Sequence, residues 1–132
     1  MTFDTRANYA IATAENGNYE HAKAVVIDLI SEDYNNAAAH RAWGRVLYKE
    51  GKASDAVAAF RVAVALDSLE PQLLFEFAEA LMYQAHRYAF VPLPNMVEAR
   101  DAVDAGLRLS PGDPKGLQLQ SQLVEHFQLV RS

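Results

Sequence analysis

Small and large apolar residues recur at helical spacing in three parts of the chain. Each set has its members separated by four and then three positions: Ala22, Val26 and Leu29; Ala56, Phe60 and Ala63; Ala99, Val103 and Gly106. Residues three and four apart lie on one face of an α-helix. Each set therefore predicts a helix that packs a compact apolar face against a neighbouring helix.

A second pattern surrounds two glycines. Gly17 and Gly51 are 34 residues apart, and each is followed five residues later by an alanine, Ala22 or Ala56. A 34-residue period of helix, glycine turn and second helix predicts a solenoid, in which each helix pair buries its apolar face only by stacking on the next pair. Folds of this kind usually bind other molecules and seldom catalyse reactions.

The second repeat resembles the tetratricopeptide consensus most clearly, at Trp43-Gly44, Leu47, Gly51, Ala56, Phe60 and Ala63. The first repeat carries the pattern in weaker form, at Tyr9-Ala10, Thr13, Gly17, Tyr19, Ala22, Val26 and Leu29. Ser68 replaces the proline that usually ends the second helix of a repeat, so we expect Asp67, Ser68 and Pro71 to set that boundary. The resemblance implies an all-α superhelix, a TPR solenoid of three helix-turn-helix repeats plus a C-terminal capping helix.

We predict one domain over residues 1–132. Its repeats are expected at about 3–36, 37–70 and 71–113, with the capping helix at about 114–130. The capping helix follows from a broad apolar face that includes Leu123 and Phe127, with Gln118, Gln122 and Glu125 opposite. A solenoid needs such a helix to cover its last hydrophobic face.

The third repeat is out of register with the second. Ala99 lies 43 residues after Ala56 instead of 34, so nine extra residues are expected between the two helices of this repeat. We assign this insertion to residues 86–94, because Pro92 and Pro94 cannot continue a helix. Its apolar side chains could flank a binding groove or fold back over their own repeat; these are Tyr88, Phe90, Val91 and Leu93.

Composition excludes several classes of protein. Twelve basic against seventeen acidic residues give a net charge of −5, which argues against non-specific nucleic-acid binding and against anionic membrane surfaces. The absence of cysteine excludes disulfides and thiolate metal sites. No basic leader and no long apolar run is visible, so we expect no membrane insertion and a cytoplasmic protein, or a periplasmic one if the chain is a domain of a longer protein.

No catalytic or metal-binding constellation is predicted. His21, His40, His86 and His126 fall in separate elements, and none has a second histidine or a cysteine at helical ligand spacing. Glu76 and Glu79 are three apart and could form a carboxylate pair, but exposed acids on a helix are usually a solvated face. No phosphate loop, nucleophile elbow or nucleotide fingerprint occurs. We therefore expect neither an enzyme nor a cofactor.

Family geometry implies where a ligand would bind. In tetratricopeptide arrays the first helices of successive pairs line a concave groove, and the resemblance places eleven residues there. They are Asn8, Arg41, Arg45, Tyr48, Lys49, Gln72, Phe75, Glu76, Glu79, Met82 and Tyr83. Asp4, Ile11 and Glu15 are expected beside Asn8 on the first helix. Arg41, Arg45 and Lys49 are four apart, so this groove would be cationic at its middle and acidic beside it.

Two hypotheses account for these charges. In the first, Arg41 and Arg45 hold a carboxylate of a partner peptide, for example its C-terminus, while Phe75, Met82 and Tyr83 take an apolar side chain. In the second, the arginines pair with Glu76 and Glu79, so the opposite charges of the groove neutralise each other within the protein. Chaperone-binding tetratricopeptide domains spread a carboxylate clamp over three helices, and here Ala42 and Glu76 stand where clamp residues are expected. A heat-shock adaptor is therefore disfavoured.

The second half of the chain looks like the tetratricopeptide domain of bacterial cytochrome c maturation factors. The similar segments are residues 69–81 and 105–119, on either side of the insertion. That resemblance implies an assembly factor or chaperone that holds C-terminal segments of apocytochrome or of assembly partners. A third possibility is a structural, self-associating unit, in which Leu129 and Val130 of the capping helix pack on a second copy to form a homodimer.

Overall fold

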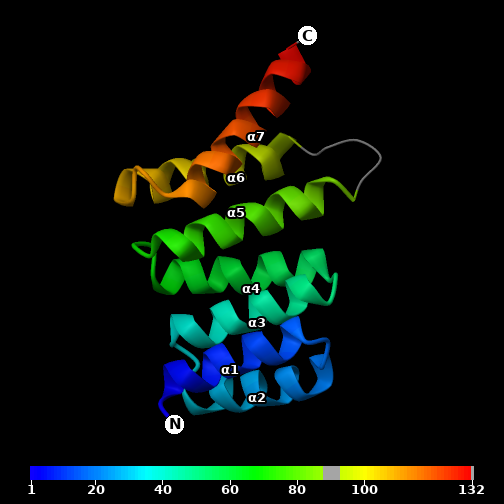
Figure 1. The fold of residues 1–132 in the computed structure, drawn as a ribbon, viewed down its shortest axis with the longest axis vertical. Helices are drawn as coiled ribbons and strands as arrows, with labels where there is room; N and C mark the ends of the chain where they lie inside the picture. Colours follow the sequence, from blue (N-terminus) through cyan, green and yellow to red (C-terminus); the bar gives the residue numbers. More distant parts are fainter. Residues whose placement is uncertain (88–92, 132) are drawn as a thin grey trace. The chain divides into compact units, whose positions relative to one another are not determined.

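The protein is described by a computed structural model that covers residues 1–87 and 93–131. Over these residues the chain forms seven α-helices and no strand, which confirms the predicted all-α class (Figure 1). The helices form two compact units, Met1–Ser68 and Leu69–Ser132, and each unit is described by itself. The division of the chain into repeats within one domain stays a prediction.

The first unit contains four helices that follow one another with short turns. They are α1 (Phe3–Glu15), α2 (Tyr19–Glu32), α3 (Ala37–Lys49) and α4 (Ala53–Leu66). The core of α1–α3 is built largely from alanine with Val26, Leu29 and Val46, and the sequence placed Val26 and Leu29 on such a face. Small side chains let helix axes approach closely, and the larger ones fill the remaining gaps.

Both repeat glycines end a helix in the same way. Gly17 and Gly51 have φ angles of 86° and 88°, in the left-handed region that an L side chain rarely adopts. At Gly17 the amide donates to Ala14 O at 2.9 Å, and the next amide donates to Thr13 O at 3.1 Å. The same pair of hydrogen bonds surrounds Gly51, so each turn is a Schellman motif that satisfies the last carbonyls of its helix. The same helix C-cap therefore recurs after 34 residues, which explains the period seen in the sequence.

Gly44 permits the close approach of α3 and α4. A Cβ atom at this position would lie 2.8 Å from Cδ1 of Phe60, a side chain that is 1% exposed. Carbon atoms in contact are normally 3.5–4.0 Å apart, so even a methyl group does not fit without movement. Glycine at this position therefore allows the close packing of α3 against α4.

The second unit contains α5 (Pro71–Ala85), α6 (Leu93–Leu109) and α7 (Pro114–Arg131). The boundary before it is confirmed, because α4 ends at Leu66 and Pro71 is the first residue of α5. Proline suits this position since its missing N–H would have no partner there. The N-terminus of α7 is capped by Asp113, whose carboxylate accepts from the Gly116 amide at 3.1 Å.

The predicted insertion is only partly a loop. Residues 88–92, with Tyr88, Phe90 and Val91, lie outside the described residues, but α6 already begins at Leu93. Pro94 is thus in the first turn of the helix, where proline is tolerated. The helices themselves take up part of the extra length: α5 has 15 residues against 13 for α3, and α6 has 17 against 14 for α4. Five of the nine additional residues therefore lengthen helices.

Candidate functional site

The cationic residues of α3 follow one face of the helix. Arg41, Arg45 and Lys49 are spaced by four, and the first two are half-buried while Lys49 is exposed. Lys49 is in the last turn of α3, where a positive charge interacts favourably with the helix dipole. We call these three residues the α3 stripe. Tyr48, which was predicted beside it, is half-buried.

One residue of the stripe is already bound to a carboxylate. The guanidinium of Arg45 donates to Oε1 of Glu15, the last residue of α1, at 3.1 Å. The side chains are 26% and 49% exposed, so this is a surface ion pair. Glu15 of α1 and Arg45 of α3 were both predicted to face the groove, and this contact shows that their side chains lie next to each other. Asn8, the other predicted residue of α1, is exposed.

On α5 the acidic residue Glu79 has a partner that the sequence analysis did not identify. Lys115, in the first turn of α7, donates to Oε1 of Glu79 at 3.0 Å. One of the two hypotheses expected an arginine of α3 as the partner of Glu79, and this α7 lysine takes that role inside the second unit. The sequence signal for Lys115 was weak, because the two residues are 36 positions apart and on helices that are not consecutive.

Phe75 does not lie on a surface that a ligand could reach. It is 0% exposed, and a Cβ atom at Gly116 would lie 2.6 Å from its Cζ atom. A Cβ at Gly106 would also clash with the ring, so Phe75 fills the space that two glycines leave between α5, α6 and α7. The prediction that Phe75 accepts an apolar side chain of a partner is therefore wrong.

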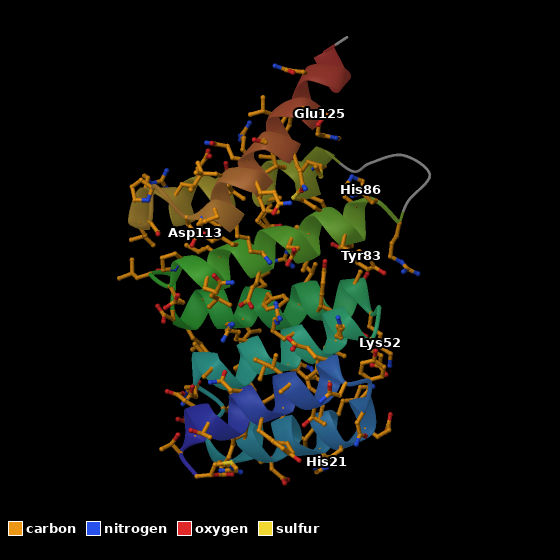
Figure 2. All side chains as sticks on the ribbon, viewed as in Figure 1. His21, Lys52, Tyr83, His86, Asp113 and Glu125 are labelled. Atoms are coloured by element: carbon orange, nitrogen blue, oxygen red, sulfur yellow. The ribbon has the colours of Figure 1, made fainter. Side chains whose placement is uncertain are left out.

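The burial of α5 corrects two further assignments. Met82 is 6% exposed and Glu76 is 2% exposed, so neither offers the contact surface that was expected of it. The physical reason is that α5 is apolar on nearly all sides, and family geometry alone cannot decide which of its side chains are accessible. Gln72, Glu79 and Tyr83 are the predicted α5 residues that remain half-buried, and Tyr83 interacts with Arg87, whose Nη1 donates to the hydroxyl at 3.2 Å (Figure 2).

Two further ion pairs lie within the first unit. Lys23 Nζ lies 2.6 Å from Glu50 Oε1, with the two side chains 17% and 18% exposed. The hydrogen bond from Lys23 lowers the pKa of Glu50 and raises the pKa of Lys23. In the same way Arg6 holds the pKa of Glu32 below its usual value. Both pairs connect a residue of α2 to another helix or its cap, so they stabilise the fold.

His21 and His40 form hydrogen bonds within the first unit. His40 is 5% exposed, and its Nε2 lies 2.6 Å from the carbonyl oxygen of Tyr34. His21 lies 3.0 Å from the hydroxyl of Tyr9. Within residues 1–87 and 93–131, no group of three or more His, Cys, Asp and Glu side chains could hold a metal ion. Over the same residues, no helix is long and apolar enough to cross a bilayer.

No protein-family model matches the sequence, and no curated protein matches it. Solved structures do match. The first TPR domain of Spaghetti (RPAP3) bound to an HSP90 peptide has a TM-score of 0.79 and 14% identity, over 94% of this chain and 91% of that one. The second TPR domain of human RPAP3, in complex with an HSP70 peptide, has a TM-score of 0.73 and 19% identity, over 89% and 91%.

A third structure is a bacterial chaperone. The type III secretion chaperone SycD of Yersinia enterocolitica, in complex with a peptide of the translocator YopD, has a TM-score of 0.73 and 20% identity, over 97% of this chain and 93% of that one. At these identities the similarity establishes the fold. This chain therefore has the tetratricopeptide-repeat fold that its sequence predicted. The resemblance of its second half to cytochrome c maturation factors stays a prediction.

Proposed function

We propose that this chain is a protein-interaction module, without catalytic activity, that binds a segment of a partner protein across the surface formed by α1 and α3. The observation that carries the proposal is the α3 stripe, in which one arginine is held by an exposed carboxylate of the neighbouring helix. The fold supports it, because each of the three solved structures above contains a bound peptide: one from HSP90, one from HSP70 and one from YopD.

The ion pair between Arg45 and Glu15 explains how such a site would work. Because both side chains are partly exposed, their pairing stabilises the free protein by about 0–1 kcal/mol only. A carboxylate of the partner can replace Glu15 on Arg45 at little cost, and Arg41 lies one turn earlier on the same face. A charge-assisted hydrogen bond that is partly desolvated contributes about 1.5–3 kcal/mol, so the exchange favours the bound state.

The chemistry of the partner follows from the charges of the site. Three cations on one face favour a segment that carries a carboxylate, either an acidic side chain or a free C-terminus. The overall charge of −5 opposes a polyanion such as nucleic acid, whose binding needs many clustered cations. Since Phe75 and Met82 are buried, the apolar part of the interaction would use a half-buried aromatic side chain of the first unit, such as Tyr48.

The test is a selection from a library of peptides displayed with free C-termini, followed by titration of one selected peptide against variants. Arg41→Glu combined with Arg45→Glu should weaken binding by roughly 10- to 150-fold, the equivalent of about 1.5–3 kcal/mol. The matched control is Arg61→Glu combined with Arg108→Glu, which changes the net charge equally at exposed positions of α4 and α6. Equal affinity of the first variant and the wild type, with unchanged helix content, would refute the proposal.

A further inference from the structure

A hollow in the second unit lies between α6 and α7. Figure 1 shows that α7 crosses α6 at an angle, and the space beside the crossing has a volume of about 310 Å³. Its floor is apolar, since Val103 of α6 and Leu123 of α7 are 0% and 2% exposed. Phe127 of α7 forms part of its wall, and the guanidinium of Arg100 lies 5.3 Å from the centre of that ring.

A second hollow, of about 250 Å³, lies on the other side of the same α7 residues. Gln120, Val124 and Gln128 line both hollows. They are four apart, so they form a ridge along α7 with a groove on each side. Val124 stands at the middle of the ridge and is 51% exposed.

The ridge itself carries no charge. Residues 116–124 are nine consecutive uncharged residues, and six of them are exposed. The ridge is followed by Glu125 (Figure 2), which lines the second hollow. Arg100 and Asp104 line the first hollow. In a chain of net charge −5, an uncharged exposed ridge is where two copies can approach without repelling each other.

We propose that α7 is a homodimer interface, in which the ridge of one copy packs into the α6–α7 hollow of a second copy about a two-fold axis near Val124. Helices pack by placing ridges into grooves, and this unit supplies both the ridge and the groove that receives it. A two-fold interface must be self-complementary, since the same patch occurs on both sides. The charges limit how the two copies can align: Arg100 and Asp104 border one hollow and Glu125 the other. The favourable arrangement places Glu125 of one copy next to Arg100 of the other and away from its Asp104.

The proposed interface is separate from the α3 stripe and goes beyond the function proposed above. The stripe lies on the first unit, and the ridge and hollows belong to the second. Dimerisation would join two peptide-binding surfaces in one particle, which raises the avidity for a partner that presents two copies of the recognised segment. An interface built around one helix crossing is small, so we expect an equilibrium that responds to protein concentrations of roughly 1–100 μM.

Sedimentation equilibrium of the full chain tests the proposal. The wild type should change from the monomer mass of 14.6 kDa to twice that mass as the concentration rises. Val124→Glu should remain monomeric over the same range, because it places a charge on the two-fold axis next to its own copy. Ala58→Glu, at an exposed position of α4, is the matched control and should dimerise like the wild type. Circular dichroism checks that all three proteins have the same helix content.

The natural absence of cysteine allows a direct test of the symmetry. Val124→Cys should form a disulfide-linked dimer on mild oxidation, because a residue near a two-fold axis lies close to its own copy. Ala58→Cys should not. A wild type that is monomeric throughout, a dimer that survives Val124→Glu, or a Val124→Cys protein that does not cross-link would each overturn the proposal.

Discussion

Replacement of Gly44 by alanine measures how closely α3 and α4 must approach. The new Cβ would lie 2.8–2.9 Å from three ring atoms of Phe60, so the ring or the helix has to move by roughly 0.7 Å to reach a normal carbon contact. Overpacking of this kind costs about 1–3 kcal/mol. Alanine in a helix interior regains about 0.8–1.0 kcal/mol relative to glycine. The net loss in the free energy of unfolding should therefore be about 1 kcal/mol.

Urea denaturation followed by circular dichroism measures this loss, and a second variant shows whether the contact causes it. In a Phe60→Leu background the ring edge is gone, so Gly44→Ala should be neutral or should stabilise by up to about 1 kcal/mol. Gly112→Ala is the control, since no atom lies within 4 Å of its added Cβ and its φ is not positive. The packing explanation is refuted if Gly44→Ala stabilises the wild type and is unaffected by the change at Phe60.

Two further predictions concern the end of α3. Gly51→Ala should lower the free energy of unfolding by about 1–2 kcal/mol, because the native φ of 88° is strained for an L side chain; equal stability in urea would contradict the Schellman cap. Glu50→Gln should destabilise the protein at neutral pH. Because the pKa of Glu50 is lowered in the folded state by Lys23, its contribution is present above the unfolded pKa of about 4.3 and is lost as pH falls through the lower, folded value. The stability difference between wild type and variant should therefore shrink below about pH 4 in urea titrations, and a difference that stays constant to pH 2.5 would contradict the ion pair.

The sequence alone predicted the helices and turns well, for identifiable reasons. Gly17 and Gly51 mark helix ends because only glycine adopts a positive φ without strain, and this preference is local. The spacing of Ala56, Phe60 and Ala63 predicted the buried face of α4, and all three are at most 1% exposed. Signals of this kind depend on one or two turns of chain, so they can be read without knowledge of the tertiary structure.

The assignment of side chains to the ligand-binding face was less successful. The family resemblance implied that Phe75 faces a ligand, but Gly106 and Gly116 make room for it in the interior. The packing of Phe75 depends on glycines that are 31 and 41 positions away, so no local sequence pattern indicates it. The pairing of Glu79 with Lys115 was missed for the same reason. In contrast, the placement of Arg41, Arg45 and Lys49 on one face follows from helical periodicity alone, because α3 includes all three residues.

The proposed function depends on recognition of a carboxylate by the α3 stripe. The most direct measurement is the affinity of one selected peptide, prepared as a free acid and as a C-terminal amide, for the wild type and for Arg41→Glu combined with Arg45→Glu. We predict that amidation weakens binding to the wild type by roughly 10-fold or more and has little further effect on the variant, because the two changes remove the same interaction. Equal affinities of acid and amide for the wild type, or equal losses on amidation in both proteins, would contradict the account for a C-terminal carboxylate.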